Sequence, residues 1–99
     1  MKYVVCYEVA DDVMAKIREH NPEHRARWAR YRDRGELLMI GPFTDLRDGA
    51  MAVFTTREAA EEFVSGDPFV LHGVVRQWRI LEWMEALVPD APDPAGAPS

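Results

Sequence analysis

The feature that most constrains the fold of this chain is the order of its hydrophobic periodicities, in which segments with the period of a strand follow or precede segments with the period of a helix. Residues 2–9 alternate with a period of two, and they place Tyr3, Val5 and Tyr7 on one face of an extended segment. β-Branched and aromatic residues dominate this segment, which is typical of a strand. By the same reasoning, further strands are expected over 37–40, 50–55 and 74–84, and helical spacing predicts helices over 21–34 and about 57–65.

Local signals predict where the first helix begins and ends. Asn21 is suited to cap the first turn and Pro22 to occupy the first helical position, so the helix is expected to begin there. Gly35 lies where a left-handed C-terminal cap belongs. The preceding residues 13–20 have only weak helical spacing, and they are interpreted as either a short helical turn or a loop.

The second helix has its own boundary signals. Thr55 with Glu58 forms a capping-box pattern, and Gly66 is expected to end the helix. Asp67 followed by Pro68 repeats the pattern of a cap before proline and opens one more short turn over 69–72.

The two middle strands are expected to form a hairpin. Asp48-Gly49 is the strongest turn signal between them. Pro42 has no N–H group to donate, so the strand pairing is expected to stop or bulge there.

The resulting order, β-α-β-β-α-β, predicts an α+β protein of the ferredoxin-like type, with a four-stranded antiparallel sheet and helices on one face. The strands carry apolar residues in both registers, as Val4 and Cys6 opposite Val5 and Tyr7 illustrate. The face without helices is therefore expected to be covered, most simply by a second copy of the chain in a homodimer.

Length and charge limit the remaining possibilities. The 99 residues are enough for a single domain, expected over 1–88, and the Pro-, Asp-, Ala- and Gly-rich segment 89–99 is expected to be a disordered tail. A net charge of −5 argues against nucleic acid or an anionic membrane as the main partner. No apolar run approaches the roughly 18 residues that span a bilayer. The single cysteine, Cys6, excludes an internal disulfide and fits a cytoplasmic location.

His24 is the leading candidate for chemistry. It shares one face of the first helix with Trp28 and Tyr31, and an imidazole titrates near neutrality, as a general acid or base requires. The alternative is a first-turn histidine that caps or packs. Asp67 is a natural helix cap before Pro68, but a carboxylate that caps can also orient an imidazole.

Other residues are weaker candidates for a pocket. Gly41 and Pro42 could form a wall or simply break an edge strand, Ser65 could hydrogen-bond a ligand, and Tyr7 is either a substrate platform or a core residue. No partner can be identified for His72.

No metal or cofactor is expected. His20 and His24 have the spacing of a helical metal pair, but a helix beginning at Asn21 would keep them off a common face. The chain has no phosphate-binding glycine-rich loop and no dinucleotide fingerprint.

Several short segments resemble the YciI-like (YCII-related) family of small dimeric α+β proteins. They are the N-terminal strand of residues 1–9, Pro22-Glu23-His24, Gly35-Glu36-Leu37-Leu38, Gly41-Pro42, Asp48-Gly49 and Gly66-Asp67-Pro68-Phe69. The resemblance implies a ferredoxin-like dimeric α/β barrel and a His–Asp pair, which falls on His24 and Asp67. One activity known in this superfamily is the dehydrochlorination of a chlorinated hydroxyhydroquinone.

Two functions follow as hypotheses. The first is a cofactor-independent enzyme that uses His24 and Asp67 for elimination or isomerisation of a small organic substrate, with cyclic and aromatic compounds among the candidates. The second is a non-catalytic ligand-binding or interaction module built on a homodimer. An RNA binder of the RRM type shares the strand order, but the chain lacks a basic sheet face and the required aromatic run.

Overall fold

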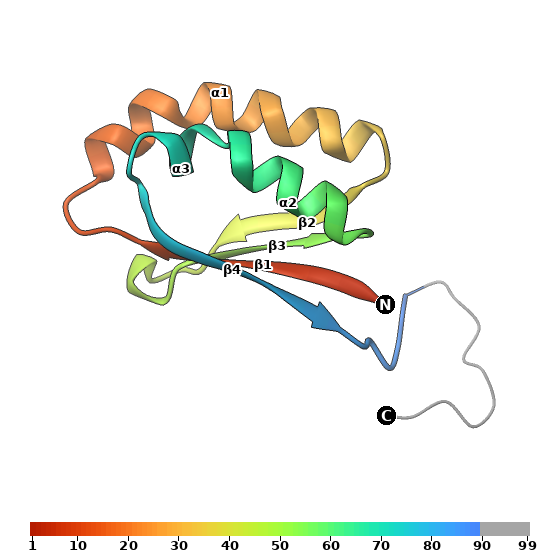
Figure 1. The fold of residues 1–99 in the computed structure, drawn as a ribbon. Coiled ribbons are helices and arrows are strands. Elements are labelled where there is room, and N and C mark those ends of the chain that lie inside the picture. The colour runs from red at the N-terminus through yellow and green to blue at the C-terminus, as the bar shows by residue number, and fades with distance from the viewer. Residues whose placement is uncertain (90–99) are drawn as a thin grey trace.

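A computed structural model describes residues 1–89, in which three helices cover one face of a four-stranded antiparallel sheet (Figure 1). The strands lie in the order β2-β3-β1-β4, which confirms the predicted α+β, ferredoxin-like arrangement. The elements are β1 (Lys2–Val9), α1 (Met14–Asp33), β2 (Leu37–Pro42), a 3-10 turn η1 (Leu46–Asp48), β3 (Ala50–Phe54), α2 (Arg57–Gly66), α3 (Pro68–Leu71) and β4 (Val75–Trp83).

The core lies between the sheet and the helices. Val5 of the central strand β1 pairs with Ala52 of β3 and Ile80 of β4, and these positions share the helix-facing side. Phe54 and Phe63 are fully buried there, and the ring of Tyr31 meets both of them edge to face. Aromatic packing therefore joins α1, α2 and β3.

Helix α1 begins earlier than the sequence signals indicate. It starts at Met14, so Pro22 lies inside the helix and Asn21 is not its cap. A proline in the helix interior removes one backbone hydrogen bond. Here the added turns bury Val13 and place Ile17 against the interior, so tertiary packing outweighs that local cost.

The longer helix also corrects the relation between His20 and His24, which now lie four residues apart on one continuous helix. The ring of His20 stacks on His72 with centroids 3.9 Å apart, which supplies the partner that could not be identified for His72. Within residues 1–89, no group of three or more His, Cys, Asp or Glu residues is arranged to hold a metal ion.

Two further boundaries differ from expectation. The side chain that caps α2 is Thr56, which accepts a hydrogen bond from the N–H of Ala59 at 3.1 Å, rather than Thr55. Pairing in β2 continues through Pro42, which lies opposite Ala50. An edge strand tolerates this proline because one side of the strand needs no ladder partner.

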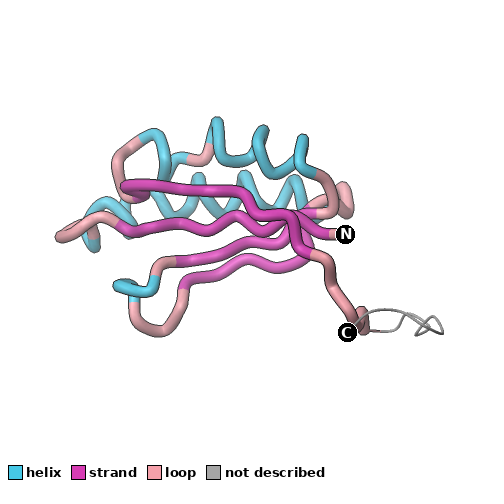
Figure 2. The backbone as a smooth tube through the Cα atoms, turned by 60° about the horizontal axis from the view of Figure 1, so that its bottom comes forward, coloured by secondary structure: helices cyan, strands magenta, loops and turns pink. Residues whose placement is uncertain are grey.

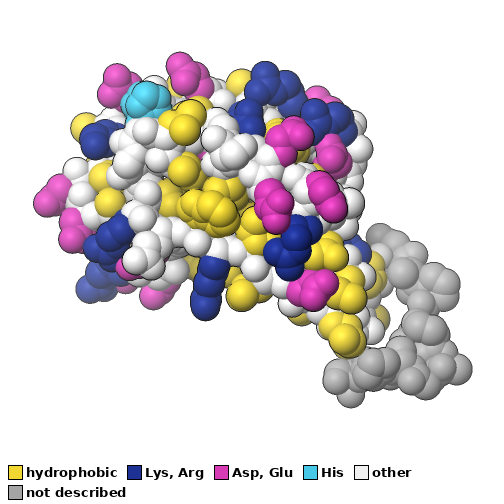
Figure 3. All heavy atoms as spheres, viewed as in Figure 1, with side chains coloured by type: hydrophobic (Ala, Val, Ile, Leu, Met, Phe, Trp, Pro, Cys, Tyr) yellow, Lys and Arg dark blue, Asp and Glu magenta, His cyan; other side chains and the backbone are white. Residues whose placement is uncertain are grey.

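The side of the sheet without helices is rich in apolar side chains, and Figure 2 shows the strands in front of the helices. By register, Val4, Val53, Met39 and Leu81 share this face, and Met39 and Leu81 are 59% and 42% exposed. Hydrophobic side chains also gather at the end of β4 (Figure 3), where Trp83 and Met84 are exposed.

The expected tail, 89–99, lies outside the described residues apart from Pro89. Within residues 1–89, every helix is too short or too polar to cross a lipid bilayer.

Candidate active site

Asp67 is a fully buried carboxylate that accepts hydrogen bonds from three different segments. Its Oδ2 accepts from the Tyr7 hydroxyl at 2.6 Å, and its Oδ1 lies 2.7 Å from Nδ1 of His24. The same Oδ1 accepts from the backbone N–H of Phe69 at 3.2 Å, which is the capping bond expected from the sequence. Capping α3 and contacting the imidazole are therefore combined in one side chain.

The chain places Asp67 at the junction between α2 and α3, where it closes one helix and opens the next. Arg27 of α1 fixes the end of α2 by donating to the carbonyls of Glu62 at 2.8 Å and Phe63 at 3.2 Å. A Cβ atom at Gly66 would lie 2.5 Å from this guanidinium, so a larger residue there would displace the Arg27 side chain.

Two contacts orient the His24 ring. The first is its hydrogen bond to Asp67, and the second is a stack on Phe69 with centroids 4.0 Å apart and planes 14° apart. A carboxylate only accepts hydrogen bonds, so Nδ1 carries the hydrogen and Nε2 of the neutral ring keeps its lone pair. Within residues 1–89, Nε2 has no hydrogen-bond partner, which leaves it available to a ligand.

Tyr7 supports Asp67 from the sheet. Burial, together with the adjacent carboxylate, raises the pKa of the Tyr7 hydroxyl far above its ordinary value. The hydroxyl therefore stays protonated and acts as a hydrogen-bond donor rather than as a base.

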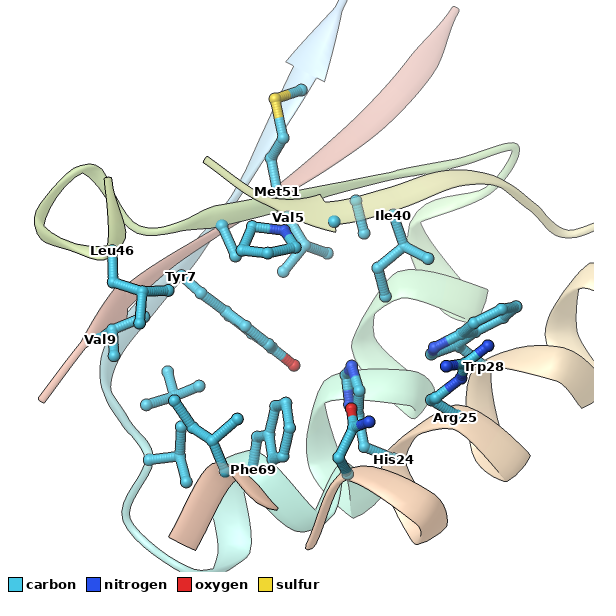
Figure 4. Close-up of a pocket in the computed structure, with 18 of the residues that line it drawn as sticks. Val5, Tyr7, Val9, His24, Arg25, Trp28, Ile40, Leu46, Met51 and Phe69 are labelled. Atoms are coloured by element: carbon cyan, nitrogen blue, oxygen red, sulfur yellow. The ribbon is translucent and has the colours of Figure 1, made fainter. Parts of the chain in front are cut away.

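A cavity of about 430 Å³ lies beside His24, between α1 and the helix-facing side of the sheet (Figure 4). Its wall is mostly apolar, and its polar side chains are Tyr7, Asn21, His24 and Arg25. The sequence-predicted residues His24, Tyr7, Gly41 and Pro42 all line this cavity, while Asp67 lies behind His24.

Ser65 does not line this cavity. Its side chain is exposed and donates to the carbonyl of Glu62 at 2.7 Å, one turn back in the same helix. This local bond uses the hydroxyl that was expected to reach a ligand.

Sequence reasoning missed Phe69, which stacks on the imidazole, and Arg25, which lines the cavity next to it. Phe69 lies two residues after Asp67, so a search for ring partners near the proposed carboxylate could have found it. Arg25 gives no such signal, because the sequence alone does not show which of the several arginines on α1 faces the cavity.

The chain is similar to known proteins in both sequence and structure. The YCII-related domain profile matches residues 1–84. The structure also resembles 5-chloro-2-hydroxyhydroquinone dehydrochlorinase from Burkholderia phenoliruptrix AC1100, solved with 2,5-dihydroxybenzoquinone, with a TM-score of 0.69 and 17% identity over 85% of this chain and 94% of that chain. At this identity the likeness shows a shared fold. No curated protein matches the chain.

Proposed function

Because the chain belongs to the YCII-related family, we propose that it is a cofactor-independent enzyme in which His24 acts as a general acid and base. The proposed reaction is elimination or isomerisation of a small, ring-sized organic substrate. One observation carries the proposal: the hydrogen bond between His24 Nδ1 and Asp67, 2.7 Å long, at the wall of a 430 Å³ cavity. The structurally similar dehydrochlorinase, whose name describes an elimination, offers an analogy for this reaction.

The chemistry starts at Nε2. This nitrogen takes a proton from a substrate C–H or O–H group, and the Asp67 carboxylate stabilises the imidazolium that forms. In an elimination, the electron pair of the broken C–H bond forms a double bond while the leaving group departs with its own bonding pair. In an isomerisation, the imidazolium returns the proton to a different carbon atom. A positioned general base of this kind contributes about 10²–10⁴-fold to the rate.

The buried setting of Asp67 favours this role. Its side chain is fully enclosed, and the Tyr7 hydroxyl and the Phe69 N–H fix the carboxylate while it faces the imidazole. A low-dielectric surrounding strengthens the attraction between carboxylate and imidazolium. The apolar wall, including Gly41 and Pro42, would hold the body of the substrate.

We propose in addition that residues 1–88 form one domain and that two copies pair through the open face of the sheet. The exposed apolar side chains of Met39 and Leu81 on that face support the pairing.

Replacing Asp67 with Asn tests the pair directly. In the wild-type protein, we expect ¹⁵N NMR to find the neutral His24 ring with its hydrogen on Nδ1, held by Asp67. In Asp67→Asn the carboxylate is gone, so we expect the Nδ1–H tautomer to lose its dominance and its proton to exchange faster with water.

The matched control is Asp33→Asn, which removes the same charge from an exposed position on α1. The control should leave the His24 spectrum unchanged. Identical His24 tautomers in the wild type and Asp67→Asn would contradict the proposal and leave the cavity as a binding site without a catalytic pair.

A further inference from the structure

The cavity has an unusual charge pattern for an acidic chain. The protein has 17 acidic and 12 basic residues, yet no Asp or Glu within residues 1–89 lines the cavity. Arg25 is the permanently charged side chain on its wall. A ligand in this cavity therefore meets a cation and no exposed carboxylate.

The guanidinium of Arg25 is available for a ligand. Within residues 1–89 it forms no ion pair, whereas Arg47 on the same molecule is paired with Asp45 at 2.7 Å. The Arg25 guanidinium lies over the indole of Trp28, whose centroid is 5.8 Å from the guanidinium carbon. This cation–π contact leaves the N–H groups of the guanidinium free to donate.

Three of the four polar side chains of the cavity lie on one wall, and the fourth, Tyr7 of β1, already donates its hydroxyl to Asp67. Asn21, His24 and Arg25 belong to α1, and Figure 4 shows Arg25 beside Trp28, with His24 nearby on the same helix. The facing wall is built by strand residues such as Val5 and Ala52, which are apolar and buried. A bound molecule would therefore direct its polar end to α1 and its apolar body to the sheet.

Building on the proposed acid–base function, we propose that Arg25 makes the cavity selective for substrates that carry an anionic oxygen, a carboxylate or a phenolate, on an apolar ring-sized body. The guanidinium fork matches two oxygens of a carboxylate or one phenolate oxygen through charge-assisted hydrogen bonds. Such an anchor would hold the ring next to Nε2 of His24, where the proton is transferred.

A pair of isosteric probes tests this selectivity without knowledge of the natural substrate. The probes are 2-naphthoate and its neutral analogue 2-naphthamide, and the measurement is isothermal titration calorimetry at low salt and about pH 8, where an ordinary imidazole is neutral. We expect the wild-type protein to bind 2-naphthoate about tenfold more tightly, and Arg25→Gln to reduce this preference to about twofold or less. Added salt should weaken the preference, because the anchor lies at the exposed rim.

Arg30→Gln is the matched control, because Arg30 is an exposed arginine on α1 that does not line the cavity. It changes the net charge equally and should keep the wild-type preference. Equal binding of the two probes, an unchanged preference in Arg25→Gln, or no binding of either probe would overturn the proposal.

The test is independent of the catalytic pair. Asp67→Asn should retain the preference for 2-naphthoate, since Asp67 does not line the cavity. If the preference is present and the His24 tautomer is insensitive to Asp67, the anion selectivity stands and the acid–base proposal fails.

Discussion

Tyr7 donates to the Asp67 oxygen that does not face His24, and the contribution of this hydrogen bond to stability can be isolated. In Tyr7→Phe, Oδ2 of a fully buried carboxylate loses its hydrogen-bond donor. An unsatisfied buried acceptor costs about 1–3 kcal/mol, so we expect the free energy of unfolding in urea to fall by that amount. The control is Tyr3→Phe, since the Tyr3 hydroxyl has no hydrogen-bond partner within residues 1–89. Equal stabilities of the two variants would contradict the role of the Tyr7 hydroxyl.

The raised pKa of Tyr7 gives this residue a characteristic pH dependence. Above about pH 10 an unfolded tyrosine loses its proton, while folded Tyr7 keeps it because of burial and the neighbouring carboxylate. The unfolded state then binds fewer protons than the folded state, so stability falls as the pH rises through this range. Tyr7→Phe should show a weaker fall than the wild type.

The residues of the candidate site were predictable to different degrees. Local rules gave Asp67 its capping role, which the structure bears out, and the family resemblance nominated His24 as its partner. Their contact joins residues 43 positions apart, and it depends on how α2 ends against α1, which local sequence rules do not describe. Ser65, also expected to reach a ligand, does not line the cavity, and its hydroxyl bonds within its own helix.

Among the elements, the junction of α1 with α2 depends on Arg27. The carbonyl of Phe63 lies in the last turn of α2, where backbone acceptors lack helical partners, and Arg27 donates to it and to the carbonyl of Glu62. We expect Arg27→Met to lower the free energy of unfolding by about 1–3 kcal/mol, because these acceptors lose charged donors.

Arg30→Met is the control for this prediction, because it removes an exposed arginine from the same helix. Urea denaturation provides the comparison, and NMR of His24 reports whether the junction still positions Asp67. A loss of stability equal to that of the control would argue against Arg27 as the connector.

Element boundaries were less predictable than element order. Asn21 and Pro22 are residue types typical of a helix start, yet α1 begins at Met14. Capping rules consider only local residue types, and they take no account of the tertiary packing that buries Val13 at the start of the longer helix. The hairpin turn at Asp48-Gly49 was predicted correctly, since Gly49 adopts a φ of 85° that favours glycine.

At the scale of the whole molecule, the apolar residues on the open face of the sheet lead us to expect a homodimer. Met39 and Leu81 are exposed on this face beside buried Val53. We expect analytical ultracentrifugation to find a dimer, and the double variant Met39→Glu, Leu81→Glu to raise the dissociation constant by about 100-fold or more, because charges would be buried against apolar surface.

The control places the same charge elsewhere. Leu71→Glu alters a 63% exposed leucine of α3, on the helical side of the sheet, and should leave association unchanged. A wild-type protein that is monomeric at micromolar concentration would contradict the pairing. The sequence already showed apolar residues in both strand registers, and in the structure these residues lie on both faces of the sheet.

The brevity of α3 has a consequence for the time scale on which His24 is aligned. Asp67 hydrogen-bonds the imidazole and caps this turn, and Phe69 stacks on the imidazole from within it. The turn is closed by hydrogen bonds from the N–H groups of Val70 and Leu71 to the Asp67 carbonyl at 2.9 and 3.0 Å. When the turn opens, the ring loses both constraints at the same moment. The lifetime of the aligned imidazole is therefore the lifetime of α3, and the rates at which the Val70 and Leu71 amide protons exchange with solvent measure it.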